Sequence, residues 1–300
     1  MTIQAHAKVN LRLRVLARDA DGYHNIETLF LRLQLADQLE VALVASPGIT
    51  LDLQLDPSLG GHDVPDDERN LAWRAAERLL EASAQTGGAT LRLEKRIPSG
   101  SGLGGASSDA AAVLTALNRQ LHRPLDHEAL HAIGGELGSD VPFFLLPDGM
   151  ALGWERGRGL LPLRPPPSRP VLLVVPPFSI GSGEAYAWVD EKRQGCESPA
   201  ASTLPAAGRM NEWDALTPLA VNDFEAVVFD RYPRLAEWKD VLVAAGAEVA
   251  LLSGSGSTLF GIFAKDEQCE HAARQFSADP EVRIVQTTTL DGPAARGDFG

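Results

Sequence analysis

Cysteine, basic residues and long apolar runs are all scarce in this sequence of 300 residues. Its two cysteines, Cys196 and Cys269, lie far apart and outside any CxxC or Cys/His cluster, which argues against a disulfide framework and against a zinc site. Apolar runs such as Val171 to Val175 are too short to cross a bilayer, and charges interrupt the N-terminus before an apolar signal core can form. We therefore expect a cytoplasmic protein without a membrane partner.

Basic residues are too few to balance the charge, because 27 lysines and arginines against 40 aspartates and glutamates leave a net charge of −13. Such a surface repels a phosphate backbone, so we expect no nucleic-acid partner. Hydrophobic residues nevertheless make up 44% of the chain, which is enough for a large buried core in one big domain or two modest ones.

Alternation of apolar and polar residues predicts a mostly antiparallel sheet in the first part of the chain. From Ala5 to Val15 the odd positions are apolar and the even positions polar, as in a half-buried strand, which places Lys8 and Asn10 on one face. Asp21-Gly22 supplies a turn after this strand. Further strands are expected over 29–35, 40–44, 49–55 and 90–97, with helices over 70–84, from about 107, and over 126–137.

The second half of the chain predicts an α+β domain. Prolines are frequent between Leu161 and Pro177, which is typical of a linker, so we place a domain boundary near the start of this stretch. We expect domains over 1–160 and 161–290 and a flexible tail over 291–300. The second domain is expected to contain strands over 171–175, 248–252, 259–263 and 282–287, and helices over 218–229, 233–245 and 267–276.

Four glycines lie between Gly100 and Gly105, where a predicted strand meets a predicted helix. The stretch fits the GxGxxG pattern of dinucleotide-binding folds. The preceding strand, however, carries charges at alternate positions, and the acidic residue about twenty positions further on, Asp126, starts a predicted helix and does not end a strand. Both features disfavour a dinucleotide-binding fold. The interpretation as a P-loop has even less support, because no Lys-Ser/Thr pair follows the glycines. Two interpretations remain: main-chain N–H groups at a helix start bind phosphate, or the loop is a tight turn with Ser107 or Ser108 as N-cap.

Other segments of the sequence decide between these interpretations. AKVNLRLRVLARDADGYHNIETLF, PSGSGLGGASSDAA, GSDVPFF and SGSGSTLFGIF occur in this order and spacing, and together they resemble the GHMP kinase superfamily of small-molecule kinases. The resemblance extends over nearly the whole chain. The motif AKVN followed by DGYH resembles the motifs of one branch of this superfamily, whose members phosphorylate a CDP-linked methylerythritol in the non-mevalonate isoprenoid pathway.

This resemblance implies an α+β, two-domain GHMP kinase fold with a ribosomal-protein-like N-terminal domain and a ferredoxin-like C-terminal domain. It also implies ATP and Mg²⁺, with the 2-hydroxyl of the CDP-linked methylerythritol as phosphoryl acceptor. Ser108 is a candidate Mg²⁺ contact, and the SGSGST segment would return against the glycine loop. The residues expected to bind ATP are Lys95, Pro98, Ser99, Gly100, Ser101, Gly102, Leu103, Gly104, Gly105, Ala106, Ser107, Ser108, Gly254, Ser255 and Gly256.

Asp140 and Lys8 are the expected catalytic residues. By resemblance to the GSDVPF element, Asp140 accepts the proton of the substrate hydroxyl, although an aspartate before an apolar run is usually a cap. Lys8 can keep that carboxylate ionised and can stabilise the negative charge on the phosphoryl group during transfer. Without the resemblance, Lys8 would be interpreted as a solvated lysine on the surface. Asn10 shares the face of Lys8 and is expected to contact the substrate.

Tyr23, His24, Ser182 and Tyr186 are expected to bind the substrate. The resemblance implies that Tyr23 and His24 recognise the cytosine and that Tyr186 stacks on its other side. The sequence departs from the family pattern at 180–183, because Ile180-Gly181-Ser182-Gly183 stands where the family usually has V-S-T-A. Ser182 keeps a hydroxyl there, while the two glycines loosen the turn.

Some features remain open at this stage. Lys95 lies in an alternating, surface-like strand, and Asp109 is interpreted as a favourable first-turn carboxylate of the following helix. A nucleotide-binding sensor without activity would keep the glycine loop but lack Asp140 or Lys8. Another GHMP kinase, acting on homoserine, galactose or mevalonate, would keep both nucleotide motifs and lack the Tyr23-His24 element.

Overall fold

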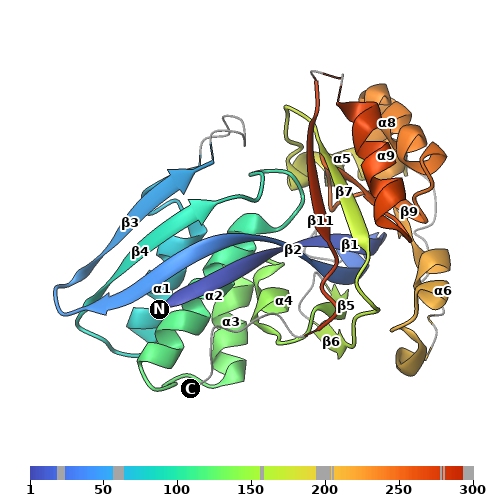
Figure 1. The fold of residues 1–300 in the computed structure, drawn as a ribbon. Helices are drawn as coiled ribbons and strands as arrows, with labels where there is room; N and C mark the ends of the chain where they lie inside the picture. The colour runs from blue at the N-terminus through green and yellow to red at the C-terminus, as the bar shows by residue number, and fades with distance from the viewer. Residues whose placement is uncertain are drawn as a thin grey trace.

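The computed structural model describes residues 1–18, 24–56, 64–155, 159–193, 204, 206–277, 279 and 281–292. Two sheets organise them, and Figure 1 shows the second sheet standing beside one end of the first. The α+β class predicted from the sequence is confirmed. No helix of the described residues is long and apolar enough to span a membrane.

The first sheet has seven strands and is mostly antiparallel. Its main order is β3-β4-β2-β1-β8, and the β5-β6 hairpin attaches through β5 to β2. β3 and β4 pair in parallel, and β8, from the second half of the chain, pairs in parallel with β1. The bounds are β1 Thr2–Arg18, β2 His24–Val44, β3 Gly48–Leu55, β4 Gly88–Lys95, β5 Met150–Trp154, β6 Gly159–Leu163 and β8 Val221–Asn222.

Two expectations about this sheet were wrong. The segments over 29–35 and 40–44 form one strand, β2, because its two ends pair continuously with β1 and β4. β1 is buried on both faces rather than half-buried. Its central apolar residues, Ala7, Val9 and Leu11, pack into the same cluster as Leu251 and Phe260 of the second sheet. The polar residues His6, Lys8, Asn10 and Arg12 are also buried, at 3–5% exposure.

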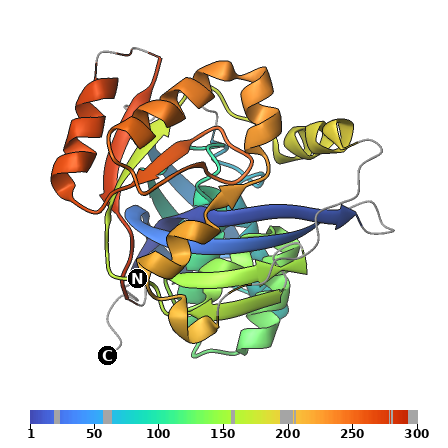
Figure 2. The same cartoon turned by 90° about the vertical axis from the view of Figure 1, so that its right-hand side faces the viewer.

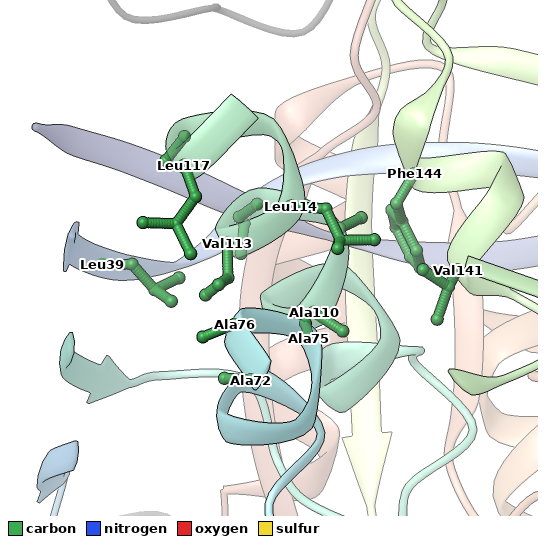
Figure 3. Packing of buried hydrophobic residues seen from close by; sticks show 14 of the residues in the cluster. Leu39, Ala72, Ala75, Ala76, Ala110, Val113, Leu114, Leu117, Val141 and Phe144 are labelled. Carbon is green, nitrogen blue, oxygen red and sulfur yellow. The ribbon is translucent and has the colours of Figure 1, made fainter. Parts of the chain in front are cut away.

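Four helices cover one face of the first sheet: α1 Leu71–Ala82, α2 Gly105–Gln120, α3 His127–Leu137 and α4 Val141–Leu145. α1 begins as predicted at Asn70, whose side chain accepts a hydrogen bond from the N–H of Ala72. Alanines of α1 lie against small and branched residues of α2 in Figure 3, so the two helices approach closely. This packing fixes α2, which begins at the glycine loop.

The second sheet is antiparallel, with the order β11-β7-β10-β9. Helices α8 and α9 cover its outer side, as Figure 2 also shows. The predicted helix over 218–229 begins only at Glu225, because Val221–Asn222 forms β8. The bounds are β7 Pro170–Val175, α5 Ser182–Lys192, α6 Trp213–Leu216, α7 Glu225–Arg231, α8 Pro233–Ala244, β9 Val249–Leu252, β10 Leu259–Ile262, α9 Asp266–Phe276 and β11 Arg283–Thr288, with single 3₁₀ turns at Ala207–Arg209 and Thr217–Leu219.

The expected domain boundary near residue 160 stays a prediction. β6 ends at Leu163 in the first sheet and β7 begins at Pro170 in the second, yet β8 returns to the first sheet. Cys269 is buried with a free thiol, and burial raises the pKa of that thiol to about 11. Cys196 and most of the expected tail lie outside the described residues.

Candidate active site

A pocket of about 1130 Å³ lies where β1, the glycine loop, α5 and the second sheet meet. Its volume exceeds what a single small ligand requires and suits two substrates bound together. Lys8 and Asn10 form part of its floor, the glycine loop forms one end, and His24 and Tyr186 form the other. We call these ends the glycine end and the aromatic end.

The glycine end is shaped by three glycines in the left-handed region, namely Gly100 (φ 64°), Gly102 (φ 80°) and Gly104 (φ 73°). L-residues rarely adopt this conformation, so the alternating glycines are a backbone requirement. At Gly102 space also forbids a side chain, because a Cβ would lie 2.1 Å from the carbonyl oxygen of Ser253. The loop is further attached to β1 by the N–H of Lys8, which donates to the Leu103 carbonyl at 2.9 Å.

α2 begins at Gly105 with Gly104 as its N-cap, so the interpretation of Ser107 or Ser108 as N-cap was wrong. A glycine cap offers no side-chain oxygen to the first N–H groups of the helix, which leaves them available to a bound anion. Gly104 to Ser107 all line the pocket. The start of this helix therefore presents N–H donors and positive potential to the glycine end.

A buried ion cluster of Lys95, Asp37 and Asp109 lies beneath the loop. Lys95 Nζ is bonded to Asp37 and, at 2.8 Å, to Asp109, and all three side chains are at most 3% exposed. Asp37 also accepts from the N–H of Ile97 at 2.8 Å. Burial raises the pKa of Asp109 to about 8, and the two carboxylates raise that of Lys95 despite its burial.

This cluster corrects two expectations. Lys95 is not a surface charge, because its ammonium is buried in the cluster beneath Gly105, and its expected contact with ATP stays a prediction. Asp109 is not a solvated first-turn carboxylate, since it is buried at 2% exposure. Together they tie the end of β4 to α2 on either side of the glycine loop, which holds the loop's two ends in place.

Lys8 and Asp140 meet in the pocket beside the glycine loop. Lys8 Nζ lies 3.3 Å from Asp140 Oδ2 and donates to Asn10 Oδ1 at 2.7 Å. The Asn10 amide in turn donates to Thr28 Oγ1 at 2.8 Å. Both ends of that amide therefore contact protein, so Asn10 orients Lys8 here, and its expected contact with the substrate stays a prediction.

Asp140 precedes α4 but its carboxylate makes no capping hydrogen bond with the described backbone. The alternative that it is an ordinary cap residue is thus not what the structure shows. Its side chain is 31% exposed, whereas that of Lys8 is 4% exposed. A carboxylate that is open to the pocket and backed by a buried ammonium is suited to accept a proton from a bound hydroxyl.

The aromatic end is built from side chains of three elements. His24 and Tyr186 are stacked with ring centroids 5.1 Å apart and an interplanar angle of 10°, and Phe224 meets Tyr186 edge-on. His24 Nε2 lies 2.8 Å from Asp190 Oδ1, and Arg18 also pairs with Asp190. Burial, with a smaller effect of Asp140, raises the pKa of Tyr186 to about 12, so its hydroxyl stays protonated at neutral pH.

In this arrangement His24 and Tyr186 stack on each other, and the expected stacking of Tyr186 on the cytosine stays a prediction. A base placed between two rings requires about 7 Å between them, twice the contact distance, so none fits between His24 and Tyr186. The two rings instead form one wall of the aromatic end. Tyr23, the expected partner on the other side, lies outside the described residues.

The SGSGST segment returns against the glycine loop as expected. Ser253 Oγ donates to the Gly102 carbonyl at 3.0 Å, and Ser255 Oγ lies 3.1 Å from Ser182 Oγ at the start of α5. The second half of the chain therefore closes the pocket over the glycine loop. Ser182 reaches this contact despite the glycines on either side of it.

Most residues expected from the sequence line this pocket. Four of the expected residues that the structure describes, Lys95, Leu103, Ser108 and Gly256, do not line the pocket. The side chains of Lys95 and Leu103 are buried, and Ser108 lines a second cavity. Sequence reasoning missed Thr28, Asp37 and Asp190. Each orients another side chain through a contact between segments that are distant in the sequence, so no local pattern marks these partners.

Comparisons with known proteins agree with this geometry. Residues 70–147 match the family model described as the GHMP kinases N terminal domain, and 201–281 match GHMP kinases C terminal. A 4-diphosphocytidyl-2-C-methyl-D-erythritol kinase from Citrifermentans bemidjiense is 40% identical over 92% of this chain and 94% of its own. One from Solibacter usitatus is also 40% identical, over 94% of this chain and 87% of its own.

Solved structures extend the likeness to three dimensions. A crystal structure of 4-(cytidine 5'-diphospho)-2C-methyl-D-erythritol kinase is similar with a TM-score of 0.76 and 35% identity, covering 97% of this chain and all of its own (100%). A homoserine kinase from Cytophaga hutchinsonii has a TM-score of 0.69 at 17% identity, covering 96% of each chain, which is a likeness of fold alone.

Proposed function

Because the chain belongs to the 4-diphosphocytidyl-2-C-methyl-D-erythritol kinase family of the GHMP kinases, we propose that its large pocket is the site of phosphoryl transfer. The protein uses ATP to phosphorylate the 2-hydroxyl of 4-diphosphocytidyl-2-C-methyl-D-erythritol in the non-mevalonate route to isoprenoid precursors. It is therefore a phosphotransferase with an alcohol group as acceptor.

The Lys8–Asp140 ion pair carries this proposal. The substrate hydroxyl oxygen attacks the γ-phosphorus of ATP, its proton passes to the Asp140 carboxylate, and ADP leaves with the electrons of the broken P–O bond. Lys8, held by Asn10 and Thr28, keeps its ammonium beside the carboxylate. From that position it stabilises negative charge as the phosphoryl group moves.

The glycine end binds the triphosphate. The N–H groups of the loop and of the start of α2 converge on it, and the buried ion cluster fixes the loop from below. ATP binding by Pro98 to Gly102, by Gly104 to Ser107 and by Gly254 and Ser255 is part of the proposal. Ser101 is a main-chain contributor here, because its hydroxyl donates to the Pro98 carbonyl at 2.6 Å.

Mg²⁺ fits this end of the pocket as the companion of the triphosphate. The described carboxylates that line the pocket are Asp140, which is paired with Lys8, and Asp190, which is paired with His24. Because Mg²⁺ retains waters and binds phosphate oxygens with few protein ligands, such a donor set is compatible with it. Ser107 is the lining hydroxyl on α2 that could contact it, in place of the expected Ser108. When bound, the ion neutralises charge on the phosphates.

The aromatic end holds the cytidine. Tyr186, backed by His24 and Phe224, offers a ring face and a protonated hydroxyl, and Ser182 offers a hydroxyl near the glycine segment of the second half. Tyr23 remains an expected partner from sequence. We further propose that the protein acts in the cytoplasm, because its substrates are charged metabolites.

Acceptor specificity tests this function. With ATP and 4-diphosphocytidyl-2-C-methyl-D-erythritol we expect release of ADP and a product one phosphate heavier, with a new phosphomonoester signal by phosphorus NMR. Mevalonate, homoserine and galactose serve as matched acceptors for the alternative that another alcohol is phosphorylated. A higher kcat/KM for one of them would contradict the assignment of substrate while leaving the kinase mechanism intact.

A further inference from the structure

A second cavity, of about 380 Å³, lies on another face of α2 from the large pocket. Ser107 lines the large pocket, whereas Ser108, Ala111 and Thr115 line the cavity. The start of β1, the turn between α2 and α3, and the end of α4 complete its walls. Its volume lies within the range that small-molecule sites occupy.

Positive charge gathers at this cavity although the chain carries a net charge of −13. Arg32, Arg119 and Arg123 line it, and Asp126 is the one carboxylate among its described lining residues. Asp126 is already engaged, because its side chain accepts from the N–H of Ala129 as the cap of α3. The cavity therefore offers a local excess of positive charge, which favours an anion.

Arg123 is held at this cavity by a strained turn. His122 and Arg123 both adopt left-handed backbone conformations, with φ 61° and 62°, which cost energy for residues other than glycine. The Asn118 side chain holds the turn by bonding both the N–H and the carbonyl of Leu125, at 3.1 and 2.9 Å. A turn maintained against strain presents an exposed arginine beside the cavity.

His6 supplies an independent sign of a ligand. Its Nδ1 lies 3.0 Å from the Leu33 carbonyl, which can only accept, so Nδ1 carries the proton and Nε2 keeps a lone pair. His6 is 4% exposed, lines the cavity, and its Nε2 has no hydrogen-bond partner among the described residues. Burial, with a smaller effect of Arg32, lowers the pKa of His6 and keeps the ring neutral. A buried acceptor of this kind favours a ligand that donates a hydrogen bond.

The rest of the wall is apolar. Leu125, Leu130, Phe144, Leu145 and Leu146 line the cavity together with alanines of α2. Arg32 is bound to this wall, since its guanidinium donates to the carbonyls of Phe143 and Leu146 and lies over the Phe144 ring. A free phosphate ion would leave such a surface uncovered, whereas a ligand with an apolar body would bury it.

We propose that this cavity is a second binding site, for a small organic anion that has an apolar body and a hydrogen-bond-donating group. The arginines attract the anionic group, the leucines and Phe144 cover the body, and His6 Nε2 accepts from the donor. Phe144 separates this site from the glycine end, because its ring lies 3.0 Å from where a Cβ on Gly104 would be.

Phenyl phosphate is a suitable probe, because at pH 6 about half of a phosphate monoester carries a donating P–OH. Calorimetric titration is performed on the full chain saturated with a non-hydrolysable ATP analogue and CDP, so that the large pocket is occupied. We expect saturable binding at one site, and binding at least about tenfold weaker for inorganic phosphate and for benzyl alcohol.

Variants locate the binding. Arg123→Gln removes one exposed charge and is expected to weaken phenyl phosphate at least about fivefold, and Thr115→Trp, which fills the cavity, to abolish binding. Arg92→Gln, an exposed arginine on β4, is the matched control and should bind like the unmodified chain. Failure of phenyl phosphate to bind the saturated protein, or equal binding by the Arg123→Gln and Arg92→Gln variants, would overturn the proposal.

Discussion

The two ends of the large pocket are built by different means. The glycine end presents main-chain N–H groups from one continuous segment, Gly100 to Ser107, and rests on a buried ion cluster. The aromatic end presents side chains from separate segments, with His24 from β2, Tyr186 from α5 and Phe224 from the turn before α7. In the proposed function, the backbone would thus hold a charged group that is common to all nucleotides, and side chains would hold a particular base.

This difference predicts how each end tolerates substitution. A main-chain site depends on backbone conformation, so a change there alters the shape of the loop and everything that packs on it. A side-chain site can lose one contact and keep its shape. Lys8 and Asp140 lie between the two ends, where neither rule alone applies.

Lys8→Met is expected to have an effect as large as any that we predict. The substitution keeps the length of the side chain but leaves Asp140 without its ammonium, so kcat should fall on the order of 10²–10⁴-fold. Steady-state kinetics measures this loss. Because the Lys8 ammonium contacts Asn10 and Asp140 and not His24 or Tyr186, the dissociation constant of CDP, measured by calorimetry, should change little.

Gly104→Val should weaken ATP more than the cytidyl substrate. Valine at φ 73° is strained, and its Cβ would lie 3.1 Å from Lys8 Cε and 3.0 Å from Phe144. A strain of about 1–3 kcal/mol corresponds to a loss of roughly five- to 150-fold in ATP affinity if the loop must relax to bind. Gly208→Val, in the 3₁₀ turn Ala207–Arg209 with open space around its Cβ and outside the described lining of the pocket, is the control. Unchanged ATP affinity in the Gly104 variant would show that the loop does not bind phosphate.

Tyr186→Ala should act at the opposite end alone. Loss of a stacking face is worth about 1–3 kcal/mol, so KM for the cytidyl substrate should rise roughly five- to 100-fold while KM for ATP stays nearly constant. Equal changes in the two KM values would remove the distinction between the ends. Tyr232→Ala, on a ring that stacks with Phe178 away from the pocket, tests whether any lost aromatic has the same effect.

The smallest expected effect concerns the ion cluster beneath the loop. The pKa of Asp109 is raised in the folded state to about 8, so between about pH 4 and pH 8 the folded protein binds the proton that the unfolded chain has released. Stability from this group is present below the unfolded pKa and is lost as the pH rises toward 8. Urea unfolding should show a midpoint that falls between about pH 4 and pH 8 and levels off above pH 8, and a shallower fall in Asp109→Asn. An equally steep fall in that variant would mean that Asp109 is ionised in the folded protein.

The same contrast explains what could be predicted from the sequence. The glycine end was predictable because its donors belong to one contiguous motif between a strand and a helix. Strand alternation correctly placed Lys8 and Asn10 on one face, and the resemblance supplied Asp140 as the partner of Lys8. The helix bounds of α1 and α3 followed from their caps, Asn70 and Asp126.

The remaining features depend on long-range contacts. Burial of β1 on both faces arises because the second sheet covers its apolar side, which a local pattern of alternation cannot reveal. Lys95 read as a surface charge because its partners, Asp37 and Asp109, are distant in sequence and reach it only through the fold. The stacking of His24 on Tyr186 likewise joins β2 to α5, so the composition of the aromatic end could be named but its geometry could not.

The proton-accepting role of Asp140 is the central claim, and the Asp140→Asn variant tests it most directly. Asparagine is nearly isosteric, and the carboxylate makes no capping bond that the fold would lose within the described backbone. We therefore predict an unchanged unfolding midpoint, unchanged affinities for ATP analogue and CDP, and a single-turnover rate lowered on the order of 10²–10⁴-fold. A single-turnover rate near that of the unmodified protein would contradict the claim and would leave phosphoryl transfer to positioning and charge neutralisation alone.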